Sequence, residues 1–286
     1  MKWIPGNSRT EQRKCIDLFW KINHEYLNPN GLPITIGDFG TLDKKTGGFQ
    51  REGNIFEHLE SRDIMAKHDW KDPRNTTSME CIFRCTSNVR RFDLPFGVGG
   101  LRARDRGLTG VVDGNVSAQF QFDTERGVLL CMRSVKYSML PIVETWVRKL
   151  EKIPVFKAKG IVTETYTCSQ YDLCMNHKGK RGVGVTTSAS IPIPVAPAIS
   201  ASANTGFNIS GSTASGSVWQ GTKNAESDSF VPMYRLKALR GGSVSRGTPL
   251  EEILVQDFPR PWNELDDDGK DIFDSDSDNS DADSDA

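Results

Sequence analysis

The residue types in this chain best suited to chemistry are its cysteines and histidines, and their spacing matches no common site. Cys81 and Cys85 stand four residues apart and Cys168 and Cys174 six apart, so neither pair is the CxxC of a zinc site. His177, the histidine nearest to the second pair, has no histidine partner in sequence. We therefore expect reduced thiols that fill apolar strand positions, and no metal site.

Motifs for catalysis and nucleotide binding are also missing from the sequence. The glycine-rich stretch FGVGGLRARDRG at 96–107 matches neither GxxxxGK[ST] nor GxGxxG, and no GxSxG or HExxH occurs. The four histidines are scattered along the chain. We expect no enzymatic activity and no cofactor; an unrecognised catalytic site that assembles only in space is an alternative.

Charge is distributed unevenly along the chain. From Glu264 to the end there are 11 acidic residues and one lysine, so this tail carries a net charge of −10. Residues 1–263 hold the remaining 35 basic and 26 acidic residues, a net charge of +9. This asymmetry predicts a body that binds an anionic partner, either a membrane or a nucleic acid, and a tail that competes in cis for that surface. The alternative is a tail that only keeps the protein soluble.

The sequence also bears on location. The N-terminal stretch MKWIPGNSRTEQRKC lacks the apolar region of a secretory signal peptide, which predicts synthesis in the cytoplasm. No run approaches the ~18 apolar residues of a membrane-spanning helix. Strands that cross a membrane leave a much weaker signal and are not excluded by this pattern.

Hydrophobic periodicity predicts a mixture of a few helices and many strands. The first half should contain an amphipathic helix at 10–27, a strand–turn–strand unit at 33–56, a short helix capped by Asn54 and a strand at 79–91. Basic residues of the first helix, namely Arg9, Arg13, Lys14 and Lys21, should lie on its outer face, and Lys44 and Lys45 at the exposed tip of the turn.

Two long hairpin regions should follow, near 115–138 and 158–220, with a helix at 142–152 between them. In the first region Val116, Ala118, Phe120 and Phe122 alternate with polar residues, as in an amphipathic strand. A last core strand is expected at 228–240 and a short helix at 249–257. The folded body should end near Arg240, which leaves 241–263 as a linker and 264–286 as an acidic disordered tail.

The order of these features resembles the pore-forming N-terminal domain of the gasdermins, most of all the short fungal gasdermin-like proteins of cell death and heterokaryon incompatibility. The segments DKKTGGFQREGNIF at 43–56 and FVPMYRL at 230–236 carry most of the likeness, which covers about residues 5–240. The resemblance implies an α+β fold with a twisted, mainly antiparallel sheet and flanking helices. It also implies long hairpin regions that can convert to a membrane β-barrel.

The resemblance further implies a mechanism. An inhibitory C-terminal part covers the domain in the cytoplasm, a protease removes it, and the freed domain binds anionic phospholipid and assembles with copies of itself into a lytic pore in the cell membrane. Residues that match the family's lipid-binding surface are Arg9, Arg13, Lys14, Lys44 and Lys45, and those of the inserting hairpin are Val116, Ala118, Phe120 and Phe122.

The C-terminal 46 residues are then interpreted as a short inhibitory appendage. Arg246 and Arg260 are candidate cleavage positions for the activating protease, and loss of the appendage would change the net charge from −1 to about +9. Phosphorylation of serines 275, 277, 280 and 284 would make the tail more acidic. The alternative functions are a nucleic-acid-binding module inhibited by its acidic tail, and a lectin-like or structural β-protein.

Overall fold

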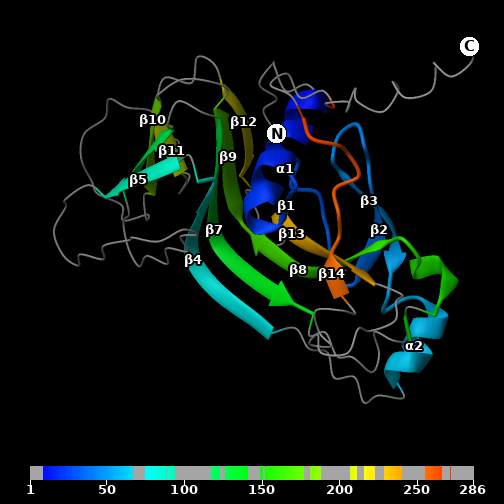
Figure 1. Cartoon of the computed structure of the whole chain (residues 1–286). Helices are drawn as coiled ribbons and strands as arrows, with labels where there is room; N and C mark the ends of the chain where they lie inside the picture. The colour runs from blue at the N-terminus through cyan, green and yellow to red at the C-terminus, as the bar shows by residue number, and fades with distance from the viewer. Residues whose placement is uncertain are drawn as a thin grey trace, which may run out of the picture.

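The computed structural model describes residues 9–66, 75–87, 89–93, 117–122, 126–140, 149–150, 152–176, 181–187, 207–210, 216–222, 229–239, 255–265 and 271. Within them the protein forms an open, mainly antiparallel β-sheet with few helices, as Figure 1 shows. This architecture is compatible with the α+β class expected from the sequence.

The main sheet is built around β7 (Gly127–Met139). Its principal strand order is β1-β13-β8-β7-β9-β12, and β4 also pairs with β7. The hairpin of β2 and β3 joins at β8, and β14 pairs with β13. The other strands of this sheet are β1 (Tyr26–Leu27), β2 (Asp38–Leu42), β3 (Phe49–Asn54), β4 (Asn75–Cys85), β8 (Gly160–Cys168), β9 (Gln170–Asn176), β12 (Gly216–Thr222), β13 (Phe230–Leu239) and β14 (Val255–Asp257).

A second sheet of four short strands, which we call the flap, packs against the main sheet. Its members are β5 (Val89–Asp93), β6 (Ser117–Phe122), β10 (Arg181–Thr187) and β11 (Phe207–Ser210), in the order β11-β10-β6-β5. Figure 1 shows the flap on one side of β7 and β9 and the first helix on the other. Gly127 permits the close approach, because a Cβ there would lie 2.7 Å from the ring of Phe122.

The predicted hairpin at 115–138 is wrong as a pairing, although both of its strands exist. β6 pairs with β5 and β10 in the flap, whereas β7 pairs with β4, β8 and β9 in the main sheet. The predicted strand at 79–91 is likewise divided between β4 and β5. Alternation in sequence reveals a strand but not its partner, because pairing depends on contacts distant in the chain.

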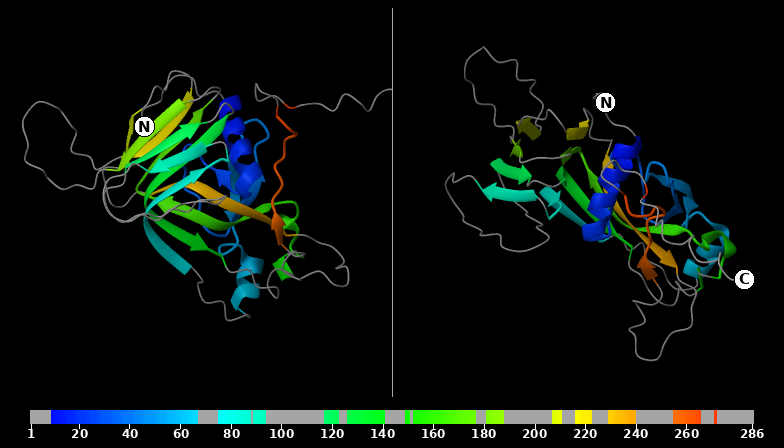
Figure 2. Two further views of the ribbon diagram at one scale, coloured as in Figure 1. Left: turned by 60° about the vertical axis from the view of Figure 1, so that its left-hand side comes forward. Right: turned by 45° about the horizontal axis from the view of Figure 1, so that its top comes forward.

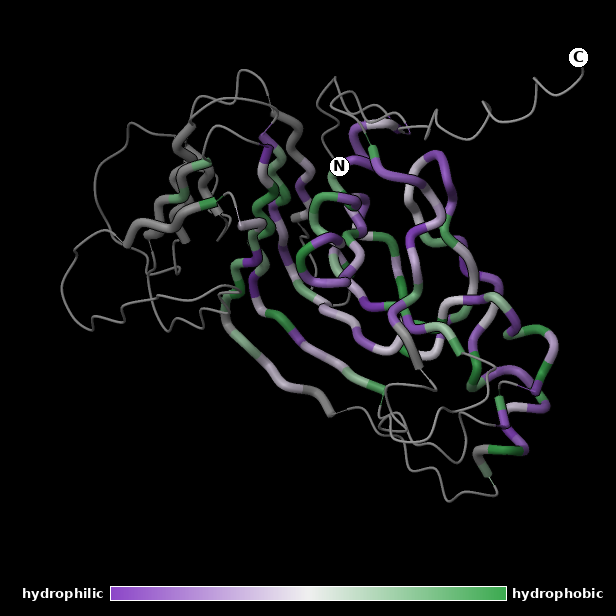
Figure 3. Tube along the Cα trace, viewed as in Figure 1, coloured by the Kyte–Doolittle hydropathy of each residue, from purple (hydrophilic) through white to green (hydrophobic). Residues whose placement is uncertain are grey.

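The named helical elements in the described part of the chain are α1 (Arg9–Asn23), α2 (Leu59–Ala66) and the 3-10 turn η1 (Pro154–Phe156), and Lys149 and Leu150 are also helical. The helix predicted at 10–27 ends four residues early, because His24 adopts a positive φ of 54° and the chain turns into β1. Hydrophilic and hydrophobic residues alternate along α1 in Figure 3. Its apolar side, with Cys15, Ile16 and Phe19, packs on the main sheet in the largest core cluster.

The remaining sequence expectations have mixed outcomes. The unit at 33–56 is confirmed as β2 and β3, and the last core strand as β13. The end of the predicted helix at 249–257 is instead the strand β14, and its start lies outside the described residues. Of the helix predicted at 142–152, residues 142–148 and 151 also lie outside them, and residues 149 and 150 are helical. The folded body also continues past Arg240, because residues 255–265 pack on α1 and β13.

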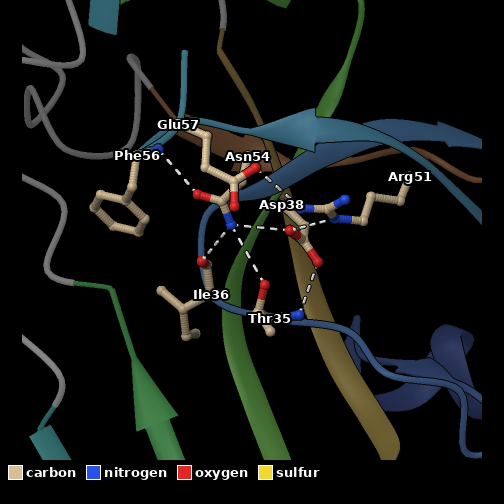
Figure 4. Close-up of polar contacts among 7 residues, drawn as sticks. All are labelled: Thr35, Ile36, Asp38, Arg51, Asn54, Phe56 and Glu57. Carbon is tan, nitrogen blue, oxygen red and sulfur yellow. Dashed lines mark hydrogen bonds and ion pairs between the residues drawn. The ribbon is translucent and has the colours of Figure 1, made fainter. Parts of the chain in front are cut away.

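A buried polar network fixes the start of the β2–β3 hairpin (Figure 4). The carboxylate of Asp38 accepts hydrogen bonds from the Thr35 amide at 2.8 Å, Arg51 Nε at 2.8 Å and Asn54 Nδ2 at 2.9 Å. Asn54 also donates to the Ile36 carbonyl at 3.0 Å. Asn54, predicted to cap the helix that follows it, therefore has two roles. Its Oδ1 accepts a hydrogen bond from the Phe56 amide just before α2, and its Nδ2 donates to the Asp38 network.

We expect Asn54→Ala to lower the free energy of unfolding by about 2–3 kcal/mol, because it leaves buried polar groups unpaired. Urea unfolding measures the difference, with Gln50→Ala, an exposed position on β3, as the matched control. A loss no larger than that of Gln50→Ala would contradict the role assigned to the network.

Candidate functional site

The basic residues predicted to bind lipid come from two elements that lie together. Arg9 is exposed at the start of α1, and Lys44 and Lys45 are exposed in the turn between β2 and β3. Arg13 joins the two, because its guanidinium donates a 2.9 Å hydrogen bond to the carbonyl of Lys44. The structure thus brings the helix and the hairpin tip into one basic surface.

Lys14 does not lie on this surface. It was predicted on the outer face of α1, yet it is only 6% exposed. Arg13 is also largely covered, with 11% of its side chain exposed. Asp271, from the far end of the chain, lies 3.4 Å from the Arg13 guanidinium, and the helical pattern of α1 contains no information about this contact.

A segment from the same end of the chain, Val255–Leu265, lies against α1, and we call it the strap. It begins as β14, paired with β13, and the Phe258 amide continues the contact by donating to the Leu236 carbonyl at 3.0 Å. The Tyr26 hydroxyl donates to the Phe258 carbonyl at 2.6 Å, and burial raises the pKa of this tyrosine. Trp262 then enters the main core, where it is 5% exposed. In Figures 1 and 2 the strap, in orange, runs beside α1.

Asp17 is the centre of the contact between α1 and the strap. Its side chain is 3% exposed, and Oδ1 accepts hydrogen bonds from Trp262 Nε1 at 2.9 Å and from the guanidinium of Arg260. Lys21 on the next helical turn lies 3.4 Å from Oδ2. Arg260 also stacks over Trp20, 5.5 Å from the ring centroid. A buried carboxylate on α1 therefore depends on two side chains of the strap.

The acidic groups near the strap neutralise basic groups of α1. Glu264 lies 3.2 Å from Lys21, and Asp271 lies 3.4 Å from Arg13. Asp271 also bridges to Leu265, which holds it close to the strap. These carboxylates pair with two of the basic groups of α1.

A second buried carboxylate anchors the end of α1 to the sheet. Glu25 accepts from the Tyr166 hydroxyl at 3.4 Å and lies 3.6 Å from Arg235 and 3.9 Å from Arg84. Burial raises the pKa of Glu25, and the attraction of the two arginines opposes that shift. Arg235 completes the anchor by donating to Glu164 at 2.8 Å and to the Asn23 carbonyl at 3.3 Å.

The residues predicted to insert into a membrane lie in the flap where they are described. Phe120 and Phe122 are each 1% exposed and pack on Leu129 and Cys131 of β7 in one cluster. Ala118 is in β6, paired with Val185 of β10. Val116 lies outside the described residues.

The two cleavage candidates differ in their situation. Arg246 lies outside the described residues, whereas Arg260 is held in the strap by Asp17. A protease would have to displace the strap to reach Arg260. Sequence reasoning missed Asp17 and Trp262 as the residues that join α1 to the strap; the usable signal was a tryptophan directly after two prolines of a supposed linker, in PRPW at 259–262.

The described part of the chain contains no group of three or more His, Cys, Asp and Glu residues that could hold a metal ion. None of the described helices is long and apolar enough to cross a membrane. The fold and site define an open, mainly antiparallel sheet protein whose basic helix is covered by its own C-terminal segment. No family model, curated protein or solved structure matches the chain.

A double-mutant cycle tests the importance of the Asp17–Arg260 contact. We expect a coupling energy of about 2–4 kcal/mol between Asp17→Asn and Arg260→Met in urea unfolding, because the pair is buried. The matched cycle between Lys21→Met and Glu264→Gln, an exposed pair, should give about 0–1 kcal/mol. Equal coupling in the two cycles would show that the strap is held by general contact and not by this pair.

Proposed function

We propose that this protein forms lytic pores in membranes of anionic phospholipid. It is held inactive in the cytoplasm by its C-terminal strap and tail, until proteolysis between the body and the strap allows it to bind the membrane and assemble with other copies. It executes regulated cell death and performs no catalysis. The observation that carries this proposal is the relation between the flap and the main sheet.

The flap repeats the main sheet strand by strand. Its order β11-β10-β6-β5 corresponds to β12-β9-β7-β4, and each flap strand is joined in sequence to its counterpart through five or fewer residues. The flap is therefore the continuation of four main-sheet strands. If it swung into line with them, two short sheets would become one long one.

The central pair would need no change of register to do this. The ladder of β7 with β8 and β9 runs from Met139 opposite Glu164 to Gly127 opposite Asn176 in a single register. Five positions further along the same register, Phe122 is opposite Arg181, which is the observed pairing of β6 with β10. The outer strands would need a shift of register. The pairing of β5 with β6 is offset by three positions from that of β4 with β7, and the pairing of β10 with β11 by two positions from that of β9 with β12.

The lined-up strands would also be amphipathic. At even positions from 118 to 132 the sequence places six apolar residues, Ala118, Phe120, Phe122, Val128, Leu130 and Met132, with the polar Thr124 and Arg126 between them. In the closed form Val128, Leu130 and Met132 face the main core. The registers pair Phe120 with Val183 and Leu130 with Leu173, so the partner strand is apolar opposite these two residues, whereas Phe122 is opposite Arg181. A membrane strand needs about 9–11 residues, and closing such sheets between copies satisfies the edge groups that lipid cannot.

The strap supports the inhibitory part of the proposal. It lies on α1, where its Glu264 neutralises Lys21, and Asp271 beyond it neutralises Arg13, beside the exposed Lys44 and Lys45. Without strap and tail, the net charge of the chain is about +9, and each basic residue near an anionic leaflet contributes roughly 1 kcal/mol of attraction.

Dye release from vesicles tests the proposal. A protease site is placed between 246 and 250 of the full chain, and Trp262→Ala is combined with it so that the cut strap dissociates. We expect the cut protein to release dye from vesicles containing phosphatidylserine and not from phosphatidylcholine alone. The matched control carries the same substitutions with an uncleavable site and should stay inactive.

Leakage from the uncut wild-type chain as well would retain the pore and overturn the inhibitory strap. If no form leaks, pore formation is wrong. Retention of the cut protein on DNA at low salt, lost as salt rises, would then favour a nucleic-acid-binding module.

A further inference from the structure

The strand β9 has an unusual composition for a strand buried on both faces. All seven of its residues are buried. Tyr171, Leu173 and Met175 point into the main core beneath α1. The four alternate residues, Gln170, Asp172, Cys174 and Asn176, therefore point to the side of the sheet that the flap covers. Two of them are amides and one is a carboxylic acid, so only Cys174 is apolar. A carboxyl group is rarely buried on such a face without a charged partner.

Asp172 is the extreme member of this stripe. It is 2% exposed, and its Oδ2 has no hydrogen-bond partner among the residues that the structure places. Gln220 of β12 is opposite it and is hydrogen-bonded to it, and Cys131 of β7 is opposite it on the other side. Burial raises the pKa of Asp172 to about 7.

The polarity of this stripe fits the lined-up arrangement better than the closed one. Continued along the sequence through β10, the even positions from 170 to 186 are Gln, Asp, Cys, Asn, Lys, Lys, Gly, Gly and Thr. The odd positions carry the apolar residues at both ends, with Tyr171, Leu173 and Met175 in β9 and Val183 and Val185 in β10. The even face is thus a water-facing surface in sequence, and closure of the flap buries part of it.

We propose that Asp172 is a pH-sensitive switch for the flap: its protonated form lets the flap close on β9, and its ionised form drives the flap away toward the lined-up ladder. This inference rests on the proposed function, since it names the regulation of the same conversion. The inference is drawn from the burial of the Asp172 carboxyl group, from its unpaired Oδ2 and from the position of the flap over the same side of the sheet.

The direction of the effect follows from linkage. An exposed aspartate titrates near 3.9, whereas closure holds the proton of Asp172 up to about pH 7. Protonation therefore favours the closed flap. The stabilisation of the closed flap by protonated Asp172 is complete below about pH 4 and is lost as the pH rises through 7. Between these values the equilibrium constant for opening rises about tenfold per pH unit.

Other groups on the same face do not reproduce this titration. The titratable groups described there are Cys81 and Cys85 of β4, Cys131 of β7 and Cys174 beside Asp172, together with the cation Arg133 of β7. Burial raises the pKa of Cys174 to about 12, and it raises the pKa of Cys131 as well. Both thiols therefore stay neutral from pH 4 to 8. The described side chains of the flap in this cluster are Val89, Phe120 and Phe122, which do not titrate.

The buried thiols provide a measurement in the full-length protein without any membrane. Cys81, Cys131 and Cys174 lie in the cluster under the flap, whereas Cys15 and Cys168 lie in the main core and report global unfolding. The protein is labelled with 4,4′-dithiodipyridine, which reacts with thiols in acid, and the modified cysteines are identified by mass spectrometry. We expect labelling under the flap, relative to Cys15 and Cys168, to rise at least tenfold between pH 5 and 7.

Asp172→Asn should abolish that rise, because the amide does not ionise, while Asp63→Asn on the exposed side of α2 should keep it. The same rise in Asp172→Asn, or no rise in the wild-type protein, would overturn the switch. Dye release separates this outcome from the proposed function. Leakage together with an Asp172-independent rise refutes only the switch, and an Asp172-dependent rise without leakage upholds the switch and refutes the pore.

Discussion

The pairing of β7 is the constraint on which the rest of the structure depends. This strand pairs along one edge with β4 and along the other with β8 and β9, so the described main sheet is organised around it. One of its faces forms the core beneath α1 and the other the core beneath the flap. Because residues alternate between the two faces, a slip of one position would exchange both cores, and the register is therefore strongly fixed.

Two surfaces are closed over this sheet by different physical means. The strap closes α1 through a buried carboxylate, Asp17, whose partners Arg260 and Trp262 come from the C-terminal segment. The flap closes the opposite face mainly through apolar contacts of Phe120 and Phe122, over a stripe that includes Asp172. Each closure thus includes a buried carboxyl group, Asp17 beneath the strap and Asp172 in the stripe on the flap side of the sheet.

The sequence predicted the elements better than their pairing. Alternation located β6 and β7 but not β14, which the sequence predicted as part of a helix, and turn chemistry located the β2–β3 hairpin, whose network around Asp38 and Asn54 is local in sequence. The strap was missed because prolines, charges and a single tryptophan are typical of a linker, and its packing depends on Asp17, more than two hundred residues away. Lys14 was misplaced for the same reason, since helical periodicity cannot identify which faces are covered.

The sequence by itself determined the charge asymmetry, the positions of strands such as β6 and β7, and the amphipathic alternation at 116–122, because these depend on residue type and local spacing. Only the tertiary structure decided that β6 and β7 belong to different sheets and that one register continues from the pairing of β7 with β9 to that of β6 with β10. It also decided that the C-terminal segment packs on α1 through Asp17. These features depend on contacts between distant segments, and the free energy of such contacts exists only once the chain has brought them together.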